Sequence, residues 1–173
     1  AAINFIERVV SEENIDCNFK RVDGFLFLHP TDDQSTIDEE FVATNKNGVR
    51  TEKIQGVPGL AGENGICLRF PDQGQFHPLK YLKGLAEYIV RNGGAIYTET
   101  HIDDIGKTGV RSKNFTIDAE HIVVATNSPI NNWVTMHTKQ HPYRTYVIGG
   151  LIPKDCIRPG LWWDTGNMRS EWV

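Results

Sequence analysis

A polar turn after an apolar run is the segment of this sequence best suited to bind an anion. Residues 122–125 form a continuous aliphatic run, as expected of a strand covered on both faces in a largely parallel sheet. Thr126, Asn127, Ser128 and Pro129 follow it and provide a turn, a capping side chain and a proline suited to a helix start. Free N–H groups at a helix N-terminus attract phosphate. Many α/β proteins have such a turn without a ligand, so a purely structural role stays open.

A second group of residues suited to chemistry lies after residue 140. Arg144 has a planar guanidinium group, whose parallel donors match a substrate carboxylate. Large aromatic rings accompany it and can wall an apolar pocket: Tyr143, Tyr146, Trp162 and Trp163. Such rings also fill the core of many sheets, and the sequence alone does not separate the two roles.

The sequence does not support metal or hydrolytic chemistry. Of the six histidines, only His137 and His141 are spaced for one face of a helix, and Pro142 disfavours a helix there. Ser128 does not lie in the G-x-S-x-G turn of a nucleophilic serine. We therefore predict no metal site and assign no catalytic residue.

Composition limits the class of protein further. Lys and Arg number 18 against 22 Asp and Glu, with no basic block, which disfavours nucleic acid or an anionic membrane as the main partner. No apolar stretch approaches the roughly 20 residues that span a bilayer. The three cysteines have no C-x-x-C spacing, so we expect reduced thiols and a cytoplasmic location.

Apolar periodicity and turn residues predict the elements that position these groups. Three helices are expected: residues 3–13, a segment between a cap at 32–35 and a stop at 47–48, and a segment from Pro78 to a stop at 92–94. The expected strands are 19–28 as a hairpin turning at Asp23-Gly24, 49–54, 65–70 and 75–76 around a turn at 72–74, 95–97, 122–125, 143–152 and 162–165. The glycines between 56 and 65 indicate a loop.

The order of these segments resembles the D-amino-acid-oxidase-like FAD-dependent oxidoreductases, the superfamily that includes glycine and sarcosine oxidases. The resemblance rests on residues 74–78 (GQFHP), 92–97 (NGGAIY), 100–105 (THIDDI), 122–128 (IVVATNS) and 141–146 (HPYRTY). Residues 161–165 (LWWDT) resemble a strand of a bacterial branch, some members of which carry a C-terminal Rieske iron–sulfur domain.

The resemblance implies an α+β fold in two interleaved parts. Residues 1–76 and 136–173 would form the antiparallel or mixed sheet of a substrate domain with its helices, and residues 77–135 a portion of the FAD-binding domain. The family's G-x-G-x-x-G segment, which holds the FAD pyrophosphate, does not occur here. We therefore expect an internal fragment of a longer enzyme, inactive alone and not retaining FAD.

The resemblance also implies roles for individual residues. His101 and Ile102 would meet the adenine end of FAD. Ala125, Thr126 and Asn127 would lie near the pyrophosphate, although the family usually has glycine where this chain has Asn127. Substrate contacts would come from Tyr143, Arg144 and Trp163.

The expected function is oxidation of an amine or amino-acid-type substrate by the full-length parent. Its expected partners are that small molecule and the remainder of its own chain, with self-association through exposed sheet edges. The alternative is a non-enzymatic α+β module that binds a small molecule or a protein. That module would have a closed core and no unpaired sheet edge at residues 122–125.

Overall fold

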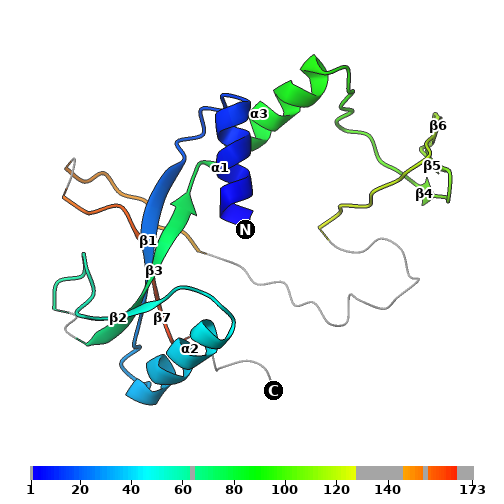
Figure 1. Cartoon of the computed structure of the whole chain (residues 1–173). Coiled ribbons are helices and arrows are strands. Elements are labelled where there is room, and N and C mark those ends of the chain that lie inside the picture. Colours follow the sequence, from blue (N-terminus) through cyan, green and yellow to red (C-terminus); the bar gives the residue numbers. More distant parts are fainter. Residues whose placement is uncertain (1, 63–64, 128–145, 154–155, 167–173) are drawn as a thin grey trace. The chain divides into compact units, whose positions relative to one another are not determined.

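The computed structural model describes residues 2–62, 65–127, 146–153 and 156–166 (Figure 1). The chain divides into two compact units. Unit 1 comprises residues 1–94 and 152–173, and unit 2 comprises residues 95–151. Both contain strands and unit 1 also contains helices, so the fold class is α+β, as predicted.

A four-stranded mixed sheet is the centre of unit 1. Its order is β2 (Glu52–Gln55), β3 (Ile66–Gln75), β1 (Lys20–Phe27) and β7 (Leu161–Asp164). β3 pairs antiparallel with both β1 and β2, whereas β7 pairs parallel with β1. The first and last parts of the chain therefore share one mixed sheet, in which β7 pairs parallel with β1.

The predicted hairpin at Asp23-Gly24 is wrong, because β1 runs straight through these residues. Two residues of β3, Pro71 and Asp72, lie opposite the single residue Asp23 and form a β-bulge. Proline has no N–H for the ladder, and Asp72 has a φ of 58°. The turn predicted at 72–74 is likewise wrong, since the turn-forming residues bend one continuous strand instead of ending it.

Each face of the sheet has its own core. On one face, α2 (Gln34–Lys46) packs Ile37 against Leu26 and Leu68, and all three are almost fully buried. On the other face, Phe25 and Cys67 pack against Val57 of the loop between β2 and β3. Burial stabilises the fold by about 1.5–3 kcal/mol for each large side chain.

The three predicted helices are confirmed: α1 (Ala2–Glu12), α2 and α3 (Pro78–Arg91). The Asp33 side chain caps α2 by accepting the N–H of Ser35 at 2.8 Å. α3 begins with proline after its N-cap His77 and ends at Asn92. Neither α1 nor α3 has a buried residue, and α3 exposes several large apolar side chains, including Leu79, Leu82 and Val90.

Unit 2 has a small antiparallel sheet of β4 (Asp104–Ile105), β5 (Gly109–Arg111) and β6 (Thr116–Asp118). The strands predicted at 95–97 and 122–125, and the described part of the one at 143–152, are wrong. Val123 is 88% exposed and Ile148 is 99% exposed. A strand needs a neighbour for its backbone hydrogen bonds, and these runs pair with no strand in the described part of the chain.

Candidate functional site

His101 and Ile102, predicted to meet the adenine end of FAD, lie just before β4. The imidazole of His101 is exposed, and its Nε2 lies 3.9 Å from Oδ1 of Asp103. Ile102 is half-buried. The ladder of the small sheet begins after them, where Asp103 donates its N–H to the C=O of Arg111 at 2.8 Å. Both candidates therefore lie outside that ladder, and His101 lines an open groove of about 570 Å³.

Ala125, Thr126 and Asn127, predicted to lie near the pyrophosphate, are exposed and belong to no helix or strand. Asn127 does not adopt the positive φ that a glycine in this turn would favour. Ser128 and the helix start predicted at Pro129 lie outside the described residues.

Trp163, predicted to wall the substrate pocket, lies in β7 on the face that α2 covers. Its indole lies over Gly24, where an added Cβ would be 2.9 Å from its Cη2, and its ring centroid is 5.5 Å from that of Phe70. Its exposed fraction is 39%, so one edge of the ring stays open. The missing side chain at Gly24 therefore makes room for this indole.

Trp162 faces the opposite side of the sheet. It stacks on Phe25 with 6.0 Å between ring centroids, and its Nε1 donates to the C=O of Pro58 at 2.7 Å. Of the two roles that the sequence left open for Trp162, pocket wall or sheet core, the structure thus shows packing in the core. Tyr143 and Arg144 lie outside the described residues, and Tyr146 is 84% exposed. The cofactor candidates lie in unit 2 and Trp163 in unit 1.

A row of ion pairs was not predicted. It lies on the face of the sheet that carries Phe25 and Cys67, which we call the Phe25 face. The guanidinium of Arg69 lies between two carboxylates, with Nε 2.9 Å from Asp23 and Nη1 2.7 Å from Glu52. Hydrogen bonds from Arg69 and then Arg50 hold the pKa of the Glu52 carboxyl below its ordinary value. Hydrogen bonds to Asp23 and then Glu52 raise the pKa of Arg69. Because two carboxylates already engage Arg69, it is not free for a substrate carboxylate.

The sequence contains only part of the signal for this row. Strand alternation places Arg69 on the same face as Cys67, which is a half-buried position for a charge. Its partner Asp23 is brought opposite by the register of β1 and β3, which depends on the bulge at Pro71 and Asp72. No residue pattern marks the length of that bulge.

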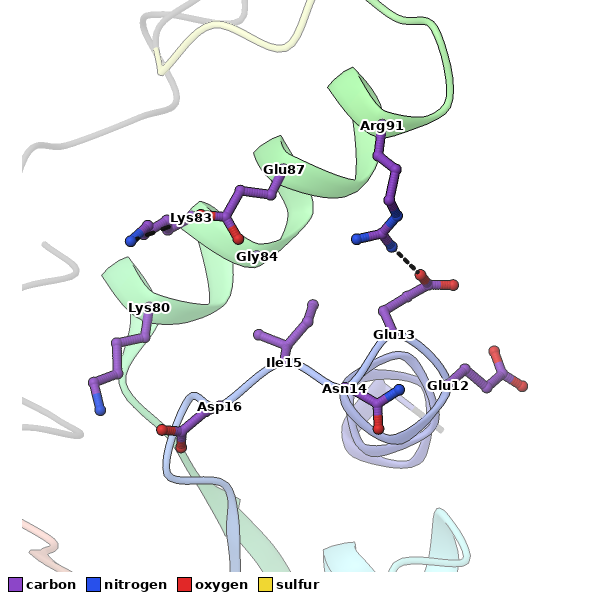
Figure 2. A pocket seen from close by; sticks show the side chains of 10 residues that line it. All are labelled: Glu12, Glu13, Asn14, Ile15, Asp16, Lys80, Lys83, Gly84, Glu87 and Arg91. Carbon is purple, nitrogen blue, oxygen red and sulfur yellow. Dashed lines mark hydrogen bonds and ion pairs between the residues drawn. The ribbon is translucent and has the colours of Figure 1, made fainter.

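A groove of about 670 Å³ lies between the end of α1 and α3 (Figure 2). Ile15 belongs to the linker between α1 and β1, residues 13–19, and points toward Gly84. An added Cβ at Gly84 would be only 2.5 Å from Cγ2 of Ile15. At one end, Arg91 pairs with Glu13 at 3.0 Å. This pairing and the close apolar contact make the groove a packing joint between α3 and the linker.

The joint fixes which side of α3 faces outward. Contacts to the linker come from Lys80, Gly84 and Arg91, which share one side of the helix. The stripe Leu79, Leu82, Ala86, Ile89 and Val90 lies on the opposite side. Its exposed fractions include 72% for Leu79 and 57% for Leu82. We call these five residues the α3 stripe.

Other classes of site find no support in the described part of the chain. No three His, Cys, Asp or Glu side chains there gather as metal ligands. None of its helices combines the length and apolarity that crossing a bilayer requires. Cys17 and Cys67 are buried free thiols and Cys156 is an exposed one. Burial raises the pKa of Cys67, whose Sγ donates to the C=O of Gly56 at 3.2 Å.

The described candidates do not form a complete cradle for FAD. The exposed side chains of His101, Thr126 and Asn127 are hydrogen-bonding groups of the kind that adenine, ribose or phosphate would need. The exposed residues 125–127 form no enclosed cavity that would hold a pyrophosphate in the described part of the chain.

Comparison with known proteins gives a consistent result. A Bacillus subtilis protein named as a Rieske 2Fe-2S iron-sulfur protein, YhfW, is 33% identical over 159 residues, which are 88% of this chain and 31% of that protein. L-Proline dehydrogenase from P. horikoshii has a similar structure, with a TM-score of 0.61 at 20% identity over 73% of this chain and 36% of the other.

Two further solved structures have the same fold. Glycine oxidase from Geobacillus kaustophilus matches with a TM-score of 0.59 at 16% identity, over 71% of this chain and 36% of the other. L-Amino acid deaminase from Proteus vulgaris matches with a TM-score of 0.57 at 19% identity, over 71% of this chain and 32% of the other. The chain thus spans about a third of the length of these relatives.

The DAO family model, described as FAD dependent oxidoreductase, matches residues 1–156 of the 173. Most of the chain is covered, including all of unit 2 and residues 1–94 of unit 1. The chain therefore belongs to the DAO family of FAD-dependent oxidoreductases.

Proposed function

We propose that this chain is part of a longer FAD-dependent oxidoreductase that oxidises an amine or amino-acid-type substrate. Residues 1–76 and 136–173 belong to its substrate domain and residues 77–135 to its FAD-binding domain. The chain by itself is inactive. The remainder of the protein supplies the pyrophosphate-binding part.

The observation that carries this proposal is the exposed apolar surface of the described residues 77–127. The α3 stripe faces away from the joint that holds the helix. Residues 95–97 and 122–125 are strand-like in composition but have exposed side chains, with Tyr97 at 71% and Val123 at 88%. A helix stripe and two apolar runs of this kind are the parts from which a helix-covered sheet is built. Additional strands from a longer chain would bury all three.

The names of the structural relatives support the proposed substrate class. One is named for oxidising glycine, one for dehydrogenating L-proline and one for deaminating L-amino acids. All three names denote removal of hydrogen or nitrogen from an amino acid. The proposed substrate contacts are Tyr143, Arg144 and Trp163, whose ring keeps an open edge.

FAD, when bound, accepts the hydride in this class of reaction. The role of the present chain is to bind and orient. The backbone at His101 and Ile102 would hold the adenine end, and Ala125, Thr126 and Asn127 would lie near the pyrophosphate. We also place the protein in the cytoplasm, because its described cysteines are free thiols.

The test is expression of the longest reading frame that contains this chain. We expect bound FAD, measured by absorbance in the flavin bands, and bleaching of those bands under anaerobic conditions by an amine or amino acid. Ile102→Pro, which removes the backbone N–H, should lower the FAD content, whereas the matched Ile102→Ala should not. Circular dichroism of both variants controls for folding.

A frame limited to this chain, or a longer protein that binds no FAD, would contradict the proposal. The alternative binding module would then be favoured. That module requires a closed core around residues 122–125, which does not agree with the exposure of Val123. Iron and acid-labile sulfide measured on the same protein would decide whether a Rieske cluster accompanies the flavin.

A further inference from the structure

Thr165 is held at three points where the parallel strands β1 and β7 end. Its N–H donates to the C=O of Phe27 at 3.1 Å, and its hydroxyl donates to Oδ2 of Asp32 at 2.6 Å. The same hydroxyl accepts the N–H of His29 at 3.0 Å. Thr165 is fully buried. Its hydroxyl is thus both donor and acceptor to the segment that follows β1.

The length, position and residue pattern of β7 do little to define its register on β1. It has four residues and lies at the edge of the sheet, in the parallel pairing that is the less stable kind. Leu161, Trp162 and Trp163 are all apolar, so no alternation assigns them to faces. A shift by one residue would exchange the faces of the two tryptophans.

Both one-residue shifts are opposed around Thr165. In one direction Thr165 would take the place of Gly166, where an added Cβ lies 2.6 Å from Cδ2 of the His29 ring. In the other direction Gly166 would take the place of Thr165, and the carboxylate of Asp32 would lose the hydroxyl that it accepts from. The first shift is blocked by contact and the second by a lost hydrogen bond to a charged group.

We propose that Asp32 and Thr165 are positioning residues that define the register of β7 and thereby select the tryptophan that faces each side. In the selected register Trp162 is stacked on Phe25, and Trp163 keeps an open edge. This inference deepens the proposed function, on which the role of Trp163 as a pocket wall rests. The register itself does not depend on FAD.

The experiment is ¹⁹F NMR of the chain labelled with 5-fluorotryptophan, with resonances assigned by Trp162→Phe and Trp163→Phe. In the wild type, we expect a larger H₂O-to-D₂O shift for Trp163 than for Trp162. Thr165→Val keeps the side-chain shape and removes the hydroxyl. It should raise the shifted population about tenfold, as expected for a hydrogen bond to a charged group, and produce a second set of resonances with the order of exposure reversed.

Matched variants separate the hydroxyl from general damage. Asp32→Ala should behave like Thr165→Val, and Thr165→Ser should restore the wild-type spectrum. Thr100→Val is the control, because its hydroxyl donates to the C=O of Thr98 in unit 2, at 2.9 Å, and its loss should change neither resonance.

Three results would overturn the inference. The first is a wild-type spectrum for folded Thr165→Val and Asp32→Ala. The second is a Thr165→Ser spectrum like that of Thr165→Val. The third is loss of folding, by circular dichroism, in the hydroxyl and carboxylate variants alike without a second set of tryptophan resonances. A longer protein without FAD would contradict the proposed function and leave the ¹⁹F result unchanged.

Discussion

Units 1 and 2 contain similar apolar runs but cover them very differently. In unit 1, Leu68 and Cys67 are fully buried between a helix on one face and a loop on the other. In unit 2, the run at 122–125 is more continuously aliphatic, yet Val123 is 88% exposed. The two units therefore differ in neighbours and not in residue type.

This difference shows what converts an apolar run into a strand. Residues 161–164 form β7 because β1 offers its backbone edge and Gly24 offers room for an indole. Residues 122–125 have no such edge within the described chain. Four measurements test or sharpen the comparison, beginning with the largest expected effect.

Truncation of a core residue should separate the units most clearly. Leu68→Ala removes a fully buried side chain from unit 1 and should lower the free energy of unfolding by about 2–5 kcal/mol. Urea unfolding followed by circular dichroism measures it. Val123→Ala in unit 2 is the matched truncation and should change the free energy by less than about 0.5 kcal/mol. Equal losses would mean that unit 2 is covered in solution.

The joint beneath α3 should respond to a single methyl group. Gly84→Ala places a Cβ about where Ile15 now lies, 2.5 Å from its Cγ2, and should cost about 1–3 kcal/mol by overpacking. Gly65→Ala, with nothing within 4 Å, is the control. Adding Ile15→Ala to the first variant should recover part of the loss. Stability equal to the wild type would show that α3 is not fixed at this contact.

The ion pairs of unit 1 should give a modest acid dependence. The folded-state pKa of Glu52 is lowered, as are those of Glu7 and Asp38, so their stabilisation is present above the unfolded-state pKa. It is lost as the pH falls through the folded-state value. Unfolding free energy should therefore decline below about pH 5, with a smaller decline in Glu52→Gln. The effect is small because these groups are exposed. Identical pH profiles would assign the decline to other groups.

The smallest effect is expected in unit 2. Val123→Asp adds a charge at an exposed position and should change the unfolding free energy of this chain by less than about 0.5 kcal/mol. In the longer protein proposed above, the same substitution would bury a charge in a sheet and reduce the yield of folded enzyme. Strong destabilisation of the present chain would show that residues 122–125 already have a cover.

Local signals sufficed for the helices. Asp33 as a cap, Pro78 at a first turn and Gly93 after a last turn act within a few residues, so α2 and α3 could be predicted from the sequence. The same signals misled at Asp23-Gly24 and at Asp72, because a bulge in a long ladder uses the residues that a turn would use.

Contacts between distant segments could not be predicted. The hydrogen bond from Thr165 to Asp32 and the ion pair of Arg69 with Asp23 depend on the strand register, which no short pattern encodes. For the candidate site, the sequence identified the segment 100–105, of which the structure places residues 104–105 in a strand. The roles of His101 and Asn127 toward a cofactor stay predictions, since both side chains lie exposed.

The three cysteines provide the molecule with internal probes of opening. Cys156 is exposed and should react with a thiol reagent at once, whereas Cys67 is sealed in the Phe25 face and has a raised pKa. Cys17 is also fully buried, in the linker beneath α3, where its C=O accepts the N–H of His77 at 2.7 Å. The labelling rates of Cys17 and Cys67 therefore report separately on detachment of α3 and on separation of the sheet from its loop. Comparing the two rates would show which of these parts of the chain opens first.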